Sequence, residues 1–399
     1  MKKKRKIKLN LNRGQRWDGT FWAIPGWNAK KIKEAKVMVV GAGALGNEVV
    51  KNLTLLNIGH LVIVDFDIVE YSNLAKSVLF RKEDKGTKKA LALARNLKSI
   101  NPEVKTLSII GDIATDVGLG VFRRMDVIIG CLDNRLARLF INQHSFKVNK
   151  TWVDGALENL SGQFHVYRPG TSCYECNLSD AAWEIIRFRM GCPDIAKRNE
   201  TVGSIATTPI ASSIIGGFQV QEALKVIFDN WGHSMAGEGF QYDGINNFFL
   251  KYEGPGLREE CDSHLLFDPI YEATNLSHTN TVREVLDWLE DHFRTNELKI
   301  LVDEDIVLQA TAAKSGSTCR TAIYKNHLSD AEEVMQLNRQ ADEELFIGQS
   351  TTYIDRTFPM PDRTLEQIGI PFLDILKVEA NQNIHFVELT GDENKLTFQ

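Results

Sequence analysis

The sequence predicts an α/β fold, with a doubly wound, mainly parallel sheet followed by a smaller α+β domain. Runs of β-branched and aliphatic residues at 36–40, 61–64 and 126–130 are typical of strands buried on both faces of a parallel sheet. Helical patterns separate these runs, and an alternation of strand and helix builds a doubly wound sheet. The pattern changes after residue 148 and again beyond about residue 268.

The remaining elements follow from local periodicity and from turn residues. In the first part, helices are expected from the glycine-rich segment after the first strand to residue 57, and then at 88–99 and 135–148. Past residue 148, strands are expected at 151–154 and 161–167, and a long helix at 211–228.

Beyond residue 268 the chain has the pattern of a separate small domain. An amphipathic helix is expected at 282–293, between strand-like runs that include 299–302 and 384–389. We therefore divide the chain into an N-terminal arm (1–30), a main domain (31–267) and a C-terminal α+β domain (268–399).

Composition excludes several classes of protein. The chain has 399 residues, is 43% hydrophobic and 25% charged, and carries a net charge of −5, so neither nucleic acid nor an anionic membrane is expected as a partner. The basic run Met1–Lys6 is followed by no long apolar stretch, which argues against a signal peptide or a membrane span. Six cysteines in a chain of this length do not form a disulfide framework, so we expect reduced thiols and a cytoplasmic location.

A glycine motif follows the first expected strand. Gly41, Gly43 and Gly46 have the G-x-G-x-x-G spacing, which lets backbone N–H groups and a helix N-terminus approach a polyphosphate on a Rossmann-type sheet. Asp65, at the end of the next strand, lies where a ribose hydroxyl would be held. Nicotinamide, flavin and ATP enzymes all use this arrangement, and a glycine turn without a ligand is the alternative.

The residues that follow favour ATP. Lys76, Lys85 and Lys89 form a cationic set that would lie beside phosphates, as an enzyme that cleaves between phosphates requires. Asp133 follows the strand at 126–130, at the strand end where open sheets bind ligands, and a carboxylate beside a triphosphate suits Mg²⁺. Taken singly, the lysines could be solvated surface residues and Asp133 a helix cap.

In this order the motifs resemble those of the ubiquitin-activating superfamily, including its ThiF/MoeB-like bacterial members. The resemblance covers about residues 13–228 and the region around Cys261. It implies that Asp65 binds the ribose, that Asn73 and Lys89 bind the phosphates and that Asp133 binds magnesium. The matching positions are Gly41/Gly43/Gly46, Asp65 and Asp67, Ser72-Asn73-Leu74 with Lys76, Gly86 with Lys89, and Asp133-Asn134 with Arg138.

Two further features bear on this resemblance. Arg13 and Arg16 are similar to the family's Arg-x-x-Arg, whose second arginine reaches the partner subunit's site, which implies a homodimer with Arg16 as a catalytic residue and residues 1–30 as the arm. The family's Arg-Gln pair is replaced by Lys76-Ser77, and a lysine keeps the charge but loses the bidentate fork of arginine.

Four residues have the spacing of a zinc site. Cys173 and Cys176 form a C-x-x-C pair, and Cys261 and His264 form a C-x-x-H pair. Together they supply the four ligands of a closed, structural Zn²⁺ site, and similar family members carry two C-x-x-C pairs at the corresponding places. A redox pair or a chance spacing is the alternative for Cys173 and Cys176.

Cys192 is the candidate nucleophile. It lies in a polar crossover region (about 177–210) before the long helix, where thioester-forming relatives carry their catalytic cysteine. Nucleophilic catalysis needs an accessible thiol, and a nearby cation such as Lys197 or Arg198 could lower its pKa. The alternative is an ordinary loop cysteine in an enzyme that stops at the adenylate or passes it to a sulfur carrier.

The resemblance therefore implies ATP-dependent adenylation of the C-terminal glycine of a ubiquitin-like protein. A thioester on Cys192 and transfer to a conjugating enzyme would follow, with the C-terminal domain recruiting that enzyme or serving only in dimerisation or solubility. Two alternatives stay open: adenylation of a sulfur-carrier protein without an enzyme thioester, and a non-catalytic scaffold subunit.

Overall fold

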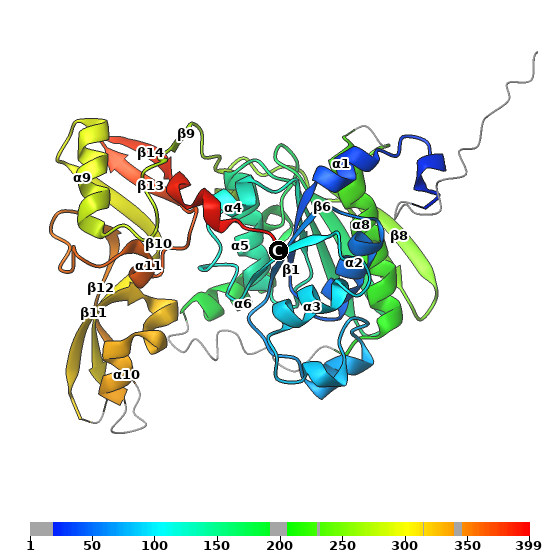
Figure 1. Ribbon diagram of the computed structural model, residues 1–399, viewed down its shortest axis with the longest axis horizontal. Helices are drawn as coiled ribbons and strands as arrows, with labels where there is room; N and C mark the ends of the chain where they lie inside the picture. The colour runs from blue at the N-terminus through cyan, green and yellow to red at the C-terminus, as the bar shows by residue number, and fades with distance from the viewer. Residues whose placement is uncertain (1–18, 192–205, 230–231, 314, 339–344) are drawn as a thin grey trace, which may run out of the picture.

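The computed structural model describes residues 19–191, 206–229, 232–313, 315–338 and 345–399. Within them the larger sheet has eight strands in the order β3-β2-β1-β4-β5-β6-β7-β8 (Figure 1). The first five strands in this order are parallel, and β6, β7 and β8 continue the sheet as antiparallel strands. The strands are β1 (Lys36–Val40), β2 (His60–Val64), β3 (Lys105–Ile109), β4 (Val127–Gly130), β5 (Trp152–Glu158), β6 (Ser161–Tyr167), β7 (Glu238–Asp243) and β8 (Phe248–Glu253).

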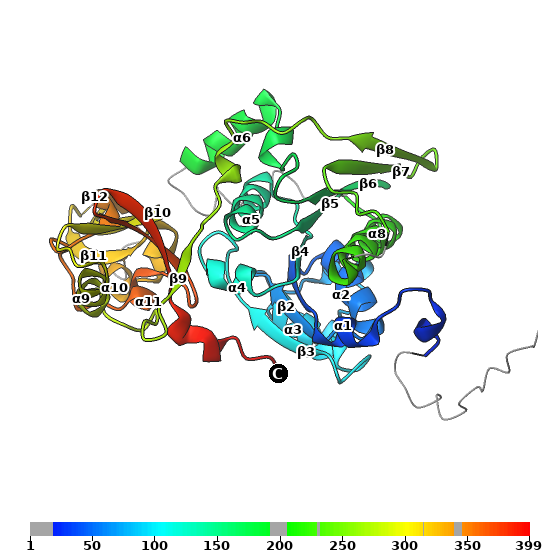
Figure 2. The ribbon, with the colours of Figure 1, turned by 90° about the horizontal axis from the view of Figure 1, so that it is seen from above.

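Helices cover both faces of this sheet, as Figure 2 shows. Because side chains alternate along a strand, Val37 and Val39 of β1 pack into one core while Met38 and Val40 pack into the other. The first core is closed by α1 (Ala29–Glu34), α2 (Ala44–Leu55), α3 (Lys89–Leu97) and α8 (Pro209–Phe228). The second is closed by α4 (Leu119–Arg123), α5 (Arg135–Lys147) and α6 (Asp180–Gly191).

A second sheet forms the C-terminal part of the chain. Its order is β11-β10-β13-β14-β9, with β12 paired to β10. The predicted helix at 282–293 is confirmed as α9, which begins at a capping box between Thr281 and Glu284. The elements are β9 (Ile270–Glu272), α9 (Val282–Phe293), β10 (Leu298–Ala312), β11 (Thr318–Tyr324), α10 (Glu332–Asn338), β12 (Leu345–Ile354), α11 (Leu365–Ile368), β13 (Ile375–Ala380) and β14 (Asn383–Glu388).

The predicted fold class is confirmed, since a mainly parallel α/β sheet is followed by a smaller α+β unit (Figure 1). The domain limits at 30/31 and 267/268 stay a prediction. Short 3₁₀ helices complete the described structure: η2 (Phe21–Ala23), η3 (Tyr71–Ala75), η4 (Lys82–Asp84), η5 (Glu175–Asn177), η6 (Asp262–His264), η7 (Lys325–Asp330) and η8 (Thr390–Lys395). Within the described residues, no helix is both long enough and apolar enough to cross a membrane.

Ion pairs hold the second sheet against the first. The side chain of Glu388, at the end of β14, is fully buried between Arg123, the last residue of α4, and Arg124, which follows it. Its carboxylate oxygens lie 2.6 Å from Nη1 of Arg123 and 2.5 Å from Nη1 of Arg124. Lys147 of α5 and Asp303 of β10 form another bridge at 2.6 Å. A buried carboxylate needs such partners, so this contact depends on both arginines.

Asp392 of η8 joins the chain's last helix to the segment before α9. Its Oδ1 accepts hydrogen bonds from Ser277 Oγ (2.5 Å) and His278 Nδ1 (2.9 Å), and its Oδ2 accepts one from the backbone N–H of His278 (2.8 Å). Burial acts to raise the pKa of Asp392, but these hydrogen bonds outweigh it and hold the pKa at about 2.

The charge on Asp392 should therefore stabilise the fold in a pH-dependent way. A carboxyl whose pKa is depressed in the folded state contributes stability that is present above its unfolded pKa near 4 and is lost as the pH falls toward 2. We expect Asp392→Asn to lower the free energy of unfolding at pH 7 by about 1–2 kcal/mol, after allowance for solvent screening. Urea unfolding of both proteins at pH 7, 4 and 3 tests this. The difference in the free energy of unfolding between wild type and Asp392→Asn should narrow below pH 4. The exposed control Asp362→Asn should not differ from wild type.

Candidate functional site

A cleft of about 710 Å³ opens at the carboxyl ends of the parallel strands of the larger sheet. Open α/β sheets bind ligands at this edge. Apart from Gly46 and Lys85, the nucleotide-site residues predicted from the sequence line it. They are Gly41, Gly43, Asp65, Asp67, Asn73, Lys76, Lys89, Asp133, Asn134 and Arg138. Gly46 lies in the first turn of α2, behind the loop.

The glycine loop is shaped by two close approaches of the backbone. Gly41 has a φ of +98°, and a Cβ there would lie 2.5 Å from the carbonyl oxygen of Cys131. A Cβ on Gly46 would lie 1.9 Å from the carbonyl oxygen of Gly41. A Cβ on Gly43, by contrast, would meet no atom within 4 Å, because this residue faces the cleft at the N-terminus of α2. The loop therefore offers a ligand its backbone and the positive end of a helix.

Asp65 is held rigidly beside this loop. Its Oδ2 accepts a hydrogen bond from the N–H of Ala42 (2.7 Å), and its Oδ1 accepts one from the N–H of Asp67 (2.8 Å). Burial raises the pKa of Asp65, and the nearby Lys89 acts in the opposite direction. A carboxylate has about four acceptor positions, so both oxygens can still accept hydroxyl donors such as those of a ribose.

The lysines divide into two groups. Lys89 and Lys76 line the cleft, and the ammonium of Lys89 lies 2.7 Å from the carboxylate of Asp67 with its side chain only 14% exposed. Lys85 does not line the cleft, because its ammonium lies over the ring of Tyr71, 4.4 Å from the centroid. The expected cationic set is thus smaller by one residue. Lys88 also points elsewhere, and donates to the carbonyl of Phe66 at 2.6 Å.

The residues after β4 have different local roles. Asp133 is exposed to the cleft, and Asn134 caps α5 by accepting a hydrogen bond from the N–H of Leu136 at 2.9 Å. Arg138 is buried, with Nε 3.1 Å from the carboxylate of Asp154 and Nη2 donating to the carbonyl of Gly155 at 3.1 Å. Burial raises the pKa of Asp154 to about 6, while Arg138 opposes that shift. Arg138 therefore fixes Asp154 and Gly155 of β5 at the wall of the cleft.

Asn47 is a site residue that the motif analysis missed. This fully buried side chain donates from Nδ2 to the carbonyls of Ala42 and Gly43, both at 3.0 Å, and its Oδ1 accepts from the N–H of Leu79 at 3.0 Å. It thereby ties the glycine loop to the segment that follows Asn73 and Lys76. The only signal in the sequence is an amide one residue beyond the third glycine.

Removing that amide should disturb the cleft. We expect Asn47→Ala to destabilise the fold by about 2–3 kcal/mol, because the carbonyl of Ala42 and the N–H of Leu79 lose the partner that the amide gives them. ATP binding should weaken about tenfold, which corresponds to about 1.4 kcal/mol. Urea unfolding and calorimetric titration with ATP measure the two effects. Asn52→Ala, on the same helix and only half-buried, is the control and should change neither.

The predicted zinc ligands converge at one point. The ligand atoms of Cys173, Cys176, Cys261 and His264 all lie within 4.8 Å of one another. The Sγ of Cys173 lies 3.6 Å from those of Cys176 and Cys261, and the Sγ of Cys176 lies 3.5 Å from Nε2 of His264. Zn–S bonds of about 2.3 Å in a tetrahedron place ligand atoms at about this separation. The four residues therefore fit a structural Zn²⁺ with no open position.

Two predicted catalytic residues, Arg16 and Cys192, lie outside the described residues. The chain on either side of Cys192 is placed. It leaves the described structure at the end of α6 and returns at Ala206, whose carbonyl accepts a hydrogen bond from the N–H of Asn159 at 2.7 Å. The next residue, Thr207, lines the cleft.

Comparison with known proteins decides the family. The model of the ThiF family matches residues 20–263, more than half of the chain. The chain is a member of the ThiF family. This confirms the resemblance to the ThiF/MoeB-like adenylating enzymes that the motifs indicated.

The relatives include both a sulfur-carrier adenylyltransferase and activating enzymes for ubiquitin-like modifiers. The chain is 29% identical over 228 residues to the sulfur carrier protein adenylyltransferase of Thermus thermophilus, a match that covers 56% of this chain and 79% of that protein. It is 31% identical over 215 residues to ubiquitin-like modifier-activating enzyme 5 of Dictyostelium discoideum, which covers 50% of this chain and 54% of that one. Against the SUMO-activating enzyme subunit uba-2 of Caenorhabditis elegans, the identity is 32% over 38% of this chain and 27% of the relative.

The chain thus spans about half or less of the length of these two activating enzymes. Among solved structures, Escherichia coli MccB with ATP is similar at 21% sequence identity and a TM-score of 0.48, with 59% of this chain and 68% of that chain covered.

Proposed function

We propose that this ThiF-family chain uses ATP to adenylate the C-terminal carboxylate of a ubiquitin-like protein. The observation that carries the proposal is that one cleft collects the glycine loop, Asp65, Lys89 and Asp133. A cleft with a ribose acceptor, an anion-binding loop, a cation and a free carboxylate suits a nucleoside triphosphate.

In this reaction the carboxylate oxygen of the carrier's terminal glycine attacks the α-phosphorus of ATP. The bond from the α-phosphorus to the bridging oxygen breaks, and pyrophosphate leaves with the electron pair, so the products are the acyl-adenylate and pyrophosphate. Negative charge grows on the leaving phosphates, where Lys89 and Arg16 of the partner subunit would stabilise it. Asp133 is the residue that would hold Mg²⁺, whose charge would offset that of the triphosphate.

A second step on Cys192 is part of the same proposal. The thiolate sulfur would attack the acyl carbonyl of the adenylate, the bond from the acyl carbon to the phosphate oxygen would break, and AMP would leave. Support comes from Thr207, which lies near the end of the crossover region in the sequence and lines the cleft. The C-terminal domain would then recruit the conjugating enzyme that takes the acyl group.

An alternative is adenylation of a sulfur-carrier protein, with no thioester on the enzyme. It is favoured by the Thermus thermophilus relative, of which the match covers 79%. A non-catalytic scaffold is a third possibility, and the charged residues gathered in the cleft argue against it.

The test is ATP–pyrophosphate exchange with a panel of ubiquitin-like and sulfur-carrier proteins that end in glycine. Wild type, Cys192→Ala and Cys319→Ala are compared, since Cys319, on β11, does not line the cleft. Exchange that needs one carrier in all three proteins, with a thiol-sensitive adduct missing only from Cys192→Ala, supports both steps. Exchange without any adduct supports the sulfur-carrier alternative. ATP binding without exchange for any carrier contradicts the proposal and favours a scaffold.

A further inference from the structure

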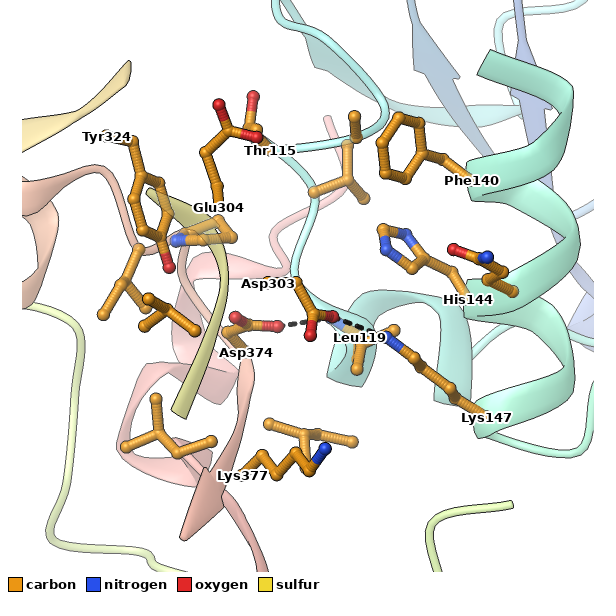
Figure 3. A pocket seen from close by; sticks show the side chains of 18 of the residues that line it. Thr115, Leu119, Phe140, His144, Lys147, Asp303, Glu304, Tyr324, Asp374 and Lys377 are labelled. Carbon is orange, nitrogen blue, oxygen red and sulfur yellow. Dashed lines mark hydrogen bonds and ion pairs between the residues drawn. The ribbon is translucent and has the colours of Figure 1, made fainter. Parts of the chain in front are cut away.

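A second cavity, of about 480 Å³, lies between the two parts of the chain (Figure 3). Its walls come from both sides. Helix α5 supplies His144 and Lys147, while the C-terminal domain supplies Asp303 from β10, Tyr324 from the end of β11 and Asp374 from just before β13. The volume is in the range of sites that hold small molecules, roughly 300–1,000 Å³. None of these residues belongs to the proposed adenylation chemistry.

Two polar rings line this cavity, and one of them has a buried ring nitrogen without a hydrogen-bond partner among the described residues. His144 is 8% exposed, its Nδ1 is buried without a partner, and burial lowers its pKa to about 3, so the ring is neutral at pH 7. Tyr324, on the opposite wall, is 7% exposed. Figure 3 shows both rings directed into the space between the domains. More than nine in ten buried polar groups have a partner, so the orphaned nitrogen of His144, facing a cavity that Tyr324 also lines, points to a polar ligand.

The cavity also carries an excess of negative charge. Three consecutive acidic residues, 303–305, lie at a bulge of β10, where Leu301 pairs with Tyr353 but Ile306 already pairs with Thr351. Asp303 is bridged to Lys147 at 2.6 Å, and Asp374 accepts a hydrogen bond from the N–H of Leu119 at 3.0 Å. The lining contains three lysines, Lys147, Lys325 and Lys377, and five carboxylates, Asp262, Asp303, Glu304, Asp305 and Asp374.

The distribution of these carboxylates does not suit a metal ion. In the described parts of the chain, the one group of three or more metal-ligating side chains that converges closely is the Cys/His cluster. The acidic groups of the cavity are instead spread along its walls, between apolar side chains such as Phe140 and Leu119. A ligand with several N–H donors on an apolar frame can meet them, whereas a compact ion cannot.

We propose that this cavity binds a small organic cation that carries amine or guanidinium groups. Its N–H groups would donate to the carboxylates, to the phenol oxygen of Tyr324 and to a ring nitrogen of His144. Because both domains contribute to the site, the bound cation would stabilise the docked arrangement of the C-terminal domain against the larger sheet. A domain proposed to receive a conjugating enzyme would thereby respond to a ligand remote from the ATP cleft.

The test is calorimetric titration of the full-length protein with spermidine and with L-arginine, at pH 7.5 and constant ionic strength. Saturable binding at one site per chain is expected for at least one of the two. Tyr324→Phe and Asp374→Asn should each weaken it at least tenfold, and Asp305→Asn, at a half-buried carboxylate of the lining, about threefold. Tyr353→Phe and Asp362→Asn replace exposed residues of the same types on the same domain and should leave the affinity unchanged.

Each contrary outcome is decisive. Absence of saturable heat with both probes overturns the proposal, as does binding that Tyr324→Phe and Asp305→Asn leave unaltered in folded protein. Circular dichroism checks folding, and if Asp374→Asn fails to fold, the variants Tyr324→Phe and Asp305→Asn still decide. ATP titration of the same samples is a separate measurement, because the proposed cation site shares no lining residue with the nucleotide cleft.

Discussion

Replacing Lys89 by alanine should slow carrier-dependent ATP–pyrophosphate exchange by about 10²–10³-fold. In the proposed reaction this ammonium meets negative charge that develops on the leaving phosphates, and an ion pair with Asp67 at 2.7 Å fixes its position. The loss of one preorganised group that stabilises the transition state typically has an effect of this size. Initial rates with saturating ATP and carrier measure it, and ATP titration shows whether binding is lost as well.

The neighbouring lysine provides the control. Lys88 has the same charge one residue earlier, but it donates to the carbonyl of Phe66 and does not line the cleft. Lys88→Ala should therefore keep exchange within about twofold of wild type, because surface charges contribute little. Equal losses in the two variants, or no loss in Lys89→Ala, would remove Lys89 from the mechanism.

Part of any loss could come from the carboxylate that Lys89 leaves behind. In Lys89→Ala, Asp67 becomes an unpaired negative charge beside the proposed triphosphate. The double variant Asp67→Asn/Lys89→Ala separates the two effects. Recovery of most of the exchange would mean that Lys89 mainly neutralises Asp67, whereas continued inactivity would mean that its own contact with phosphate matters.

The parts of this fold that were predictable are those encoded locally. The helix at 282–293 has its apolar residues on one face and its capping pair Thr281 and Glu284 three residues apart, so its bounds can be read from the sequence alone. The glycine loop and Asp65 were predictable for a related reason, since their positions follow from two consecutive strands of one sheet.

The missed features depend on contacts between distant segments. Asn47 acts through the N–H of Leu79, 32 residues away, and no spacing rule links those positions. Lys85 was grouped with the phosphate lysines by its place in the chain, but its direction is set by the ring of Tyr71. The interdomain cavity needs Lys147 and Asp303 to meet across 156 residues, which periodicity cannot reveal.

The topology of the C-terminal sheet also depends on contacts between distant segments. Its amphipathic helix and several strands were expected, but not the parallel pairing of β9 with β14, in which Ile270 faces Phe386. That pairing brings the start of the domain beside its end. It also places Glu272 and Glu388 where both pair with Arg123 of α4. A long-range strand pair thus brings together two of the carboxylates that hold the C-terminal domain against α4.

Cys261→Ser should abolish stoichiometric zinc binding and loosen the C-terminal domain. Cys261 and His264 lie in the segment that leads to this domain, and the His264 ring stacks on Phe146 of α5 with centroids 5.6 Å apart. Three residues later, Phe267 donates its N–H to the carbonyl of Lys147 at 2.9 Å. A closed tetrahedral site contributes several kcal/mol or more to the structure it crosslinks, so loss of one ligand should affect this whole segment.

Wild type should therefore carry one zinc per chain by elemental analysis, and Cys261→Ser close to none. Thermal unfolding of the variant should begin at least about 5 °C lower, and limited proteolysis should cut first between residues 254 and 268, where the chain loses its attachment to α5. Cys319→Ser, a half-buried cysteine of β11 outside the cluster, should match wild type in all three measurements. Zinc-free wild-type protein with the same stability and cleavage pattern would instead mean that Cys173, Cys176, Cys261 and His264 pack as an ordinary thiol cluster. The attachment of the C-terminal domain would then rest on its other contacts, such as those of Glu388 with its two arginines and of Asp303 with Lys147.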